Sequence, residues 1–170
     1  AAVPAVLFAG ATTTLRGVGW LVVVAVGAVL LIDLSDRLTE WDLATGKLLH
    51  RLAGHEGRVH DLRFLADSGG LVSCGADATV RSWDLATGDP TGLERIEGAA
   101  PRWLGVTAEP EFIVIACEDG GVRLRQAAGD EDLASWQAEG PANSLAVSRD
   151  GQLLAVGDNR GSVALLSVEQ

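Results

Sequence analysis

The sequence predicts an all-β fold of repeated antiparallel sheets, and three observations support this class. Short apolar or alternating segments are separated by Gly- and Asp-containing turns, as in residues 54–88, which indicates a meander rather than helices. The hexamer WDLATG occurs at residues 41–46 and again at 83–88, an offset of 83 − 41 = 42. The same offset relates Asp77 to Asp119. Because about 40–45 residues with four strands is the period of a propeller blade, we predict a β-propeller.

The period divides the whole chain, residues 1–170, into four blades' worth of sequence in one domain. Three complete four-stranded blades are predicted near residues 17–54, 58–98 and 101–140. Residues 141–170 supply three strands of a fourth, and residues 5–9 align with the outermost strand of the first blade. We expect residues 5–9 to complete the last blade, because pairing the two ends removes exposed sheet edges.

Three arrangements of these blades remain open. The chain forms a closed four-blade ring with the N-terminal strand added in cis, or two copies exchange that strand to make eight blades, or the chain is a segment of a larger ring. We favour the multi-chain or larger ring, because a four-blade ring would crowd its inner strands. The chain contains no Met and begins with Ala, so we expect a processed or excised piece of a longer protein.

Residues 17–32 carry no charge, which raises the alternative of a membrane anchor or signal sequence. The run has 16 residues, fewer than the roughly 20 that a spanning helix needs, and it is rich in β-branched residues. The repeat also places Trp20 on Leu62 and Val22 on Phe64. We therefore expect two buried strands joined at Gly27-Ala28, and no membrane association.

Composition limits the possible partners and the compartment. The net charge is 13 − 23 = −10, and such an acidic protein repels phosphate backbones, so nucleic-acid binding is not expected. Cys74 corresponds by the repeat to Ala116 and not to Cys117. Because side chains alternate faces along a strand, this offset argues against a disulfide and favours reduced thiols in the cytoplasm.

One unit carries a motif beyond its turns. Gly54-His55 and Trp83-Asp84, with 28 positions from His to Trp, resemble the WD-repeat family. The resemblance covers most of the chain, but only this unit has the full motif. It implies a structural hydrogen-bonded tetrad that ties the loop before the first strand to the second and third strands. Its members are His55, Ser73, Asp77 and Trp83.

The same residues could suggest a Ser-His-Asp hydrolase, but no nucleophile-elbow sequence accompanies them, so no catalytic residue is assigned. The other blades depart from the motif: position 83 becomes Arg125 and then Leu166, and position 55 becomes Thr13. We expect those blades to depend more on apolar packing.

No metal or cofactor site is predicted. His50, His55 and His60 are five residues apart, but the repeat puts them on an outer strand, a loop and an inner strand, so convergence on a metal is not expected. The acidic run at 130–132 is interpreted as a solvated turn. A Gly-rich phosphate loop followed by Lys is absent from the sequence.

Four residues are candidates for partner binding because they lie where loops enter the inner strands, and Arg and Trp are enriched in binding hot spots. They are Arg58, His60, Arg102 and Trp103. In the alternative interpretation Trp103 packs between blades and the arginines only keep an acidic protein soluble.

We predict a non-enzymatic scaffold for protein-protein interaction, part of a larger bacterial-style multidomain protein, with a protein partner and a possible homodimer or further blades. A small-molecule or sugar sensor that uses the central channel is the second hypothesis. It is disfavoured because the inner strands are mostly Val, Leu, Gly and Ala. An enzyme is the third.

Overall fold

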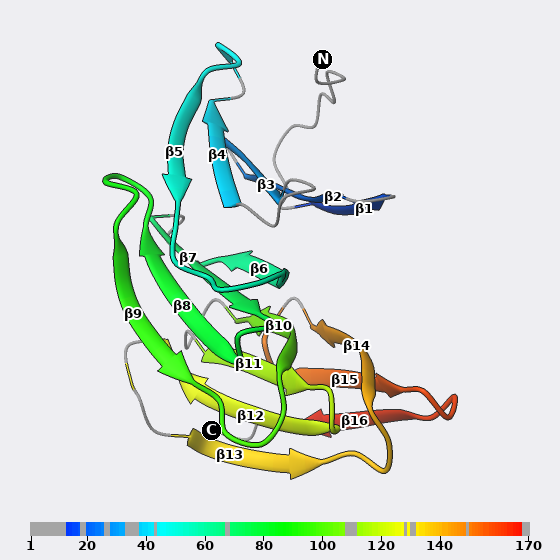
Figure 1. Ribbon diagram of the computed structural model, residues 1–170. Helices are drawn as coiled ribbons and strands as arrows, with labels where there is room; N and C mark the ends of the chain where they lie inside the picture. Colours follow the sequence, from blue (N-terminus) through cyan, green and yellow to red (C-terminus); the bar gives the residue numbers. More distant parts are fainter. Residues whose placement is uncertain are drawn as a thin grey trace.

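In the computed structural model four antiparallel sheets follow one another along the chain (Figure 1). The structure describes residues 13–17, 20–25, 28–32, 38–42, 44–66, 69–107, 112–127, 129, 132–148 and 150–167, and only the backbone of the first three ranges. All regular elements in these ranges are strands. The all-β class and the antiparallel sheets predicted from the sequence are confirmed.

The first sheet has five strands in the order β1-β2-β3-β4-β5. Their bounds are β1 (Thr13–Gly17), β2 (Trp20–Ala25), β3 (Ala28–Ile32), β4 (Leu38–Asp42) and β5 (Leu48–Leu52). The repeat aligned Thr13 with the loop residue His55, whereas the structure places Thr13 in β1, paired with Val24. Two β-branched residues and a short connection from Gly17 to Trp20 favour this added hairpin.

Strands β2 and β3 lie in the uncharged N-terminal run, and they pair with each other from Leu21 and Ile32 to Ala25 and Ala28. Across the described ranges, no helix has the length and apolar character needed to cross a membrane. Residues 5–9, expected to form the fourth strand of the last blade, lie outside the described residues.

The next two sheets have four strands each, in chain order. The second contains β6 (Val59–Phe64), β7 (Gly70–Gly75), β8 (Thr79–Asp84) and β9 (Pro90–Arg95). The third contains β10 (Pro101–Val106), β11 (Phe112–Cys117), β12 (Gly121–Gln126) and β13 (Asp132–Gln137). The last sheet has three described strands, β14 (Ala142–Val147), β15 (Leu153–Asp158) and β16 (Val163–Ser167).

Each sheet packs on the next through an apolar layer. Leu38 and Leu52 of the first sheet meet Leu62, Leu71 and Trp83 of the second. Two equivalent layers lie between the second and third sheets and between the third and fourth. A strand presents alternate residues to its two faces, so an interior sheet contributes to two layers. This alternation explains the nearly continuous apolar runs of β7 and β11.

The two WDLATG segments form the same turn at the same place in successive sheets. Asp42 Oδ1 accepts hydrogen bonds from the Ala44 and Thr45 amides at 2.8 Å, and Asp84 makes the corresponding pair of bonds in its own turn. The glycines that end the turns, Gly46 and Gly88, have φ of 66° and 78°. Their positive φ suits glycine because it has no Cβ.

The two cysteines are free and buried. Their offset by one position in the repeat was expected to keep the two thiols apart, but the structure brings them together. Cys74 and Cys117 lie in the same apolar layer between the second and third sheets. Two sheets that face each other contribute opposite faces to one layer, so residues one position out of phase in successive sheets come together. Burial raises the pKa of both thiols, that of Cys117 to about 11.

Candidate functional site

The second sheet contains a continuous chain of hydrogen bonds among the four tetrad residues. Trp83 Nε1 donates to Ser73 Oγ at 2.8 Å, and Ser73 Oγ lies 2.8 Å from His55 Nε2. His55 Nδ1 lies 3.0 Å from both carboxylate oxygens of Asp77. Because a carboxylate only accepts, Nδ1 carries the proton and Nε2 accepts from the Ser73 hydroxyl. The loop at His55 is thereby tied to β7, to β8 and to the turn between them.

Asp77 is the last member of this series of hydrogen bonds, and its side chain has further donors. Its carboxylate accepts from the Glu56 amide at 2.9 Å and from Thr79 Oγ1 at 2.8 Å. Burial alone would raise the pKa of Asp77, but hydrogen bonds from Glu56, Thr79 and His55 outweigh it and lower the pKa to about 2. Burial lowers the pKa of His55, against the opposing effect of Asp77. The pair is therefore a neutral imidazole beside an ionised carboxylate.

The four hydrogen-bonded residues, His55, Ser73, Asp77 and Trp83, form an internal structural contact, called the clasp below. Ser73 is fully buried, and its oxygen already accepts the indole N–H. The His55 and Asp77 side chains are 4% and 7% exposed. A substrate carbonyl has no access to Ser73 Oγ without displacement of Trp83, so the Ser-His-Asp combination is not arranged for nucleophilic attack.

The four candidate partner-binding residues divide into two pairs. Arg58 and Arg102 are exposed, and Arg102 Nη1 donates to Glu118 Oε1 at 2.8 Å. His60 and Trp103 are half-buried and engaged with the following sheet. His60 Nδ1 lies 3.0 Å from the Pro101 carbonyl oxygen, and Trp103 Nε1 donates to the Ala142 carbonyl at 3.2 Å. Only the two arginines present their side chains to solvent.

Sequence reasoning missed two charged contacts between sheets. Asp61 is fully buried in β6, and its Oδ2 accepts from the Leu104 amide of β10 at 3.0 Å. Its other oxygen accepts from Arg63 Nη1 at 2.6 Å. The available signal was an acidic residue within the inner strand Val59–Phe64. Asp61 links two innermost strands that are far apart in the sequence.

The second missed contact lies in the third sheet, at the position equivalent to Trp83. Apolar packing was expected to replace the tetrad in this sheet, and the structure shows an ion pair instead. Arg125 takes that position, is 5% exposed, and pairs with Glu94 of β9 and Asp132 of β13. Arg125 Nη2 donates to Glu94 Oε1 at 2.6 Å and to Asp132 Oδ1 at 2.8 Å. An ion-paired guanidinium therefore replaces the indole and joins the second sheet to the third.

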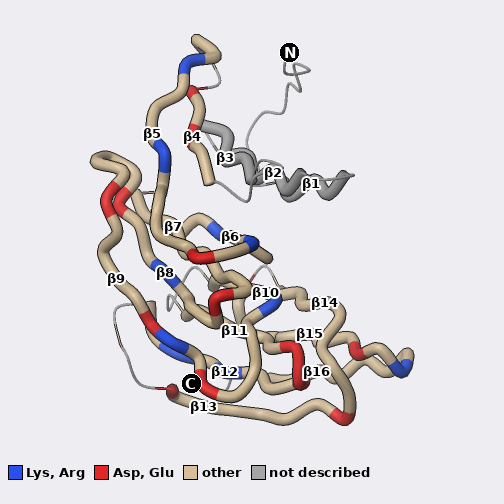
Figure 2. Tube along the Cα trace, in the orientation of Figure 1, with Lys and Arg blue, Asp and Glu red and all other residues tan. Residues whose placement is uncertain are grey.

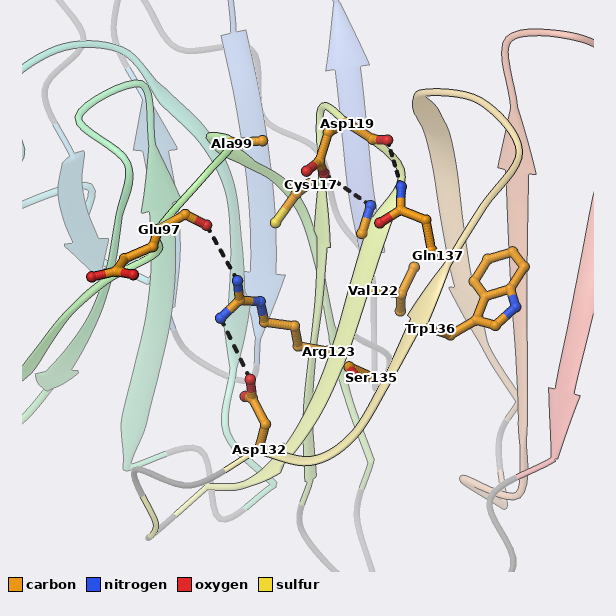
Figure 3. A pocket seen from close by; sticks show the side chains of 11 residues that line it. Glu97, Ala99, Cys117, Asp119, Val122, Arg123, Asp132, Ser135, Trp136 and Gln137 are labelled. Carbon is orange, nitrogen blue, oxygen red and sulfur yellow. Dashed lines mark hydrogen bonds and ion pairs between the residues drawn. The ribbon is translucent and has the colours of Figure 1, made fainter.

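Two of the cavities lined by described residues bear on the hypothesis of a small-molecule sensor. The first, of about 530 Å³, lies where the second and third sheets meet and is shown in Figure 3. In it Arg123 is held between the Glu97 carbonyl, at 3.2 Å, and Asp132, at 3.4 Å. The second, of about 440 Å³, is lined by β6, β10, β14 and the residues that follow β6 and β10. Its one charged residue among the lining side chains, Arg63, is already paired with Asp61. This lining offers few groups to orient a small polar ligand.

The histidines do not converge. His50 Nδ1 lies 3.1 Å from Glu40, and His55 and His60 make the separate contacts given above. Within the described ranges, no group of three or more His, Cys, Asp or Glu side chains is arranged to hold a metal ion. Basic and acidic positions are distributed over the described sheets (Figure 2).

Comparison with known proteins identifies the repeat. Residues 46–84 match the family model described as WD domain, G-beta repeat. Periodic tryptophan protein 2 homolog of Neurospora crassa is 30% identical over 171 residues, which cover 86% of this chain and 18% of the relative. WD repeat-containing protein 18 of Bos taurus is 29% identical over 135 residues, 76% of this chain and 30% of the relative.

A shorter match is to the human protein named TAF5-like RNA polymerase II p300/CBP-associated factor-associated factor 65 kDa subunit 5L. It is 41% identical over 58 residues, 34% of this chain and 10% of the relative. The chain thus spans less than a third of the length of these relatives. All three are eukaryotic, so they lend no support to the expected bacterial origin. The family match, the spacing of the repeats and these relatives together show that the chain belongs to the WD-repeat family.

Proposed function

We propose that this protein is a non-enzymatic interaction scaffold that binds a protein partner through the loops entering β6 and β10. The observation that carries the proposal is the exposure of Arg58 and Arg102 at these loops, while His60 and Trp103 are engaged inside the fold. The Arg102 side chain is 46% exposed and its partner Glu118 50%. An ion pair this exposed contributes little to stability, so Arg102 is available to exchange Glu118 for a partner's carboxylate.

The relatives support a protein partner as the binding class. One carries the words associated factor and subunit in its name, and another is a CCR4-associated factor 4 homolog. The net charge of −10 favours a protein surface over a nucleic acid. We place the scaffold in the cytoplasm, a proposal supported by the free, buried state of Cys74 and Cys117.

The proposal can be tested by affinity capture of the protein partner on this protein immobilised on a solid support. Partner recovery is compared for the wild type, Arg58→Ala, Arg102→Ala and the control Arg51→Ala, which removes an exposed arginine on β5. We expect the first two substitutions to reduce recovery at least severalfold and the control to leave it unchanged. Equal recovery with all four proteins would contradict the proposed surface. Unfolding curves of the variants exclude a loss of fold as the cause.

We also propose that residues 5–9 add the outermost strand to the last sheet, in the same chain or by exchange. Among the described strands, β16 pairs only with β15, whereas each of the other sheets has a strand beyond the equivalent one. Hydrogen exchange of the β16 amides provides the test. Removal of residues 1–10 is expected to abolish protection at alternate amides of Val163–Ser167, and unchanged protection would contradict the proposal.

A further inference from the structure

The cavity of about 530 Å³ between the second and third sheets lies where the clasp lies one sheet earlier. The offset of 42 residues makes Glu97 the equivalent of His55 and Asp119 the equivalent of Asp77. In the second sheet the imidazole packs against the carboxylate, and His55 Nδ1 lies 3.0 Å from Asp77. In the third sheet both equivalent residues line the cavity, which we call the Asp119 cavity.

Two differences between the sheets account for this cavity. Figure 3 shows the Glu97 carboxylate directed away from Asp119, so Glu97 does not take the place of the imidazole. Gly121 stands where the second sheet has Thr79, whose hydroxyl donates to Asp77 at 2.8 Å. The third sheet therefore has neither the imidazole nor the hydroxyl beside its carboxylate.

The oxygen acceptors of the Asp119 cavity have capacity for further donors. Within the described ranges, the Asp119 carboxylate accepts one hydrogen bond, from the Gly121 amide at 2.9 Å. Gln137 Nε2 donates to the Asp119 carbonyl at 2.8 Å, which leaves Gln137 Oε1 as an acceptor. A Cβ on Gly121 would lie 3.1 Å from Asp119 Oδ1 and 3.6 Å from Gln137 Oε1, so both oxygens border one region. A ligand group with several N–H donors fits this arrangement.

The lining of the Asp119 cavity is negatively charged. Its charged members are one arginine and three carboxylates, 1 − 3 = −2, namely Arg123, Glu97, Asp119 and Asp132. Arg123 Nη1 is 3.4 Å from Asp132, so its charge is offset within the lining. Burial raises the pKa of the Cys117 thiol to about 11, and among the charged neighbours Asp119 contributes most in the same direction. The electrostatic field in the cavity therefore favours a cation.

The Asp119 cavity adjoins the surface proposed for partner binding. Ala99, in the loop that enters β10, is part of its lining. The Glu118 amide donates to the Ala100 carbonyl at 3.0 Å, which fixes this loop beside the turn that carries Asp119. The Glu118 side chain also holds Arg102. A partner bound at Arg102 would therefore reach the cavity.

We propose that the Asp119 cavity binds an arginine side chain of the protein partner, an inference that rests on the proposed scaffold function for the partner itself. The guanidinium takes the place that the His55 imidazole has in the second sheet, with the Asp119 carboxylate and Gln137 Oε1 as acceptors. Arginine fits better than lysine because its planar group carries five N–H donors, which reach several acceptors at once. The partner then presents a carboxylate to Arg102 and a guanidinium to the neighbouring cavity.

Binding of a short peptide tests the proposal without the partner. The probe is acetyl-Ala-Arg-Ala-amide, and its uncharged control contains citrulline in place of arginine. In an NMR titration of isotope-labelled protein, we expect saturable shifts of the Gly121 and Gln137 amides with a dissociation constant on the order of 1 mM. The citrulline peptide is expected to bind at least about tenfold more weakly, because it lacks the charge that Asp119 attracts.

Two variants locate the binding site. Gly121→Thr fills the cavity with the side chain that the second sheet carries at Thr79, and Asp119→Asn removes the charge. Each is expected to weaken binding of the arginine peptide at least about tenfold. The matched controls are Gly92→Thr, on β9, and Asp158→Asn, in the last sheet, and both should bind like the wild type.

Thermal unfolding of the variants excludes a loss of fold as the cause. The proposal would be overturned by the absence of saturable shifts with the arginine peptide, by equal binding of the citrulline peptide, or by undiminished binding to Gly121→Thr. The titration contains no partner protein, so failure of peptide binding and failure of the affinity capture are separate results.

Discussion

Replacement of Ser73 by Ala is expected to destabilise the fold by about 2–6 kcal/mol. The hydroxyl serves two buried groups: it accepts from Trp83 Nε1 and it bonds to His55 Nε2, both at 2.8 Å. Trp83 is 1% exposed and the His55 side chain 4%, so water does not replace the lost partner. Each buried polar group left without a partner costs about 1–3 kcal/mol, and two are affected.

Urea denaturation at one protein concentration measures the loss, with tryptophan fluorescence as the signal. The control Ser135→Ala removes an exposed hydroxyl on β13 and should change the unfolding free energy by less than about 0.5 kcal/mol. The double variant Ser73→Ala with Trp83→Phe removes the stranded N–H as well, so its cost should be less than the sum of the two single costs. A loss below about 0.5 kcal/mol for Ser73→Ala would refute the assignment of the clasp as a determinant of stability.

Three further outcomes are expected. Ala78 has φ of 58°, a conformation that favours glycine, so Ala78→Gly should stabilise the fold by about 0.5 kcal/mol in thermal unfolding. The equivalent Gly120 has φ of 90°, and a Cβ there would collide with a backbone carbonyl oxygen, so Gly120→Ala should destabilise the fold by more than about 1 kcal/mol. Glu94→Ala leaves the buried Arg125 with one carboxylate partner and should cost about 1–3 kcal/mol in urea, while an unchanged midpoint would show that the ion pair contributes nothing. The pKa of Asp77 falls from its ordinary 3.8 to about 2 on folding, so its ionisation contributes about 2 kcal/mol to stability above pH 4. This contribution is lost as the pH falls toward 2. Asp77→Asn should therefore flatten the dependence of the unfolding free energy on pH between pH 4 and 2.

The repeat could be predicted from the sequence because its causes are local or periodic. The offset between the two WDLATG segments placed the same Asp-anchored turn in two sheets, and turn chemistry depends on a few neighbouring residues. The resemblance carried by Gly54-His55 and Trp83-Asp84 implied a tetrad, and the fold connects its four residues by hydrogen bonds. The strand at Thr13–Gly17 was not anticipated, because the repeat assigned that segment to a loop and its pairing depends on an added hairpin.

The sequence by itself determined the all-β class and the period of the sheets, because alternation and turn chemistry depend on neighbouring residues, whereas the residues of the clasp were predicted from the resemblance to the WD-repeat family. Only the tertiary structure decided which candidate binding residues remain at the surface and which polar groups join neighbouring sheets. Arg125 meets Glu94 from 31 residues away, and Asp61 meets the Leu104 amide from 43 residues away. Such contacts depend on how one sheet is rotated and stacked on the next, and no local pattern specifies that geometry.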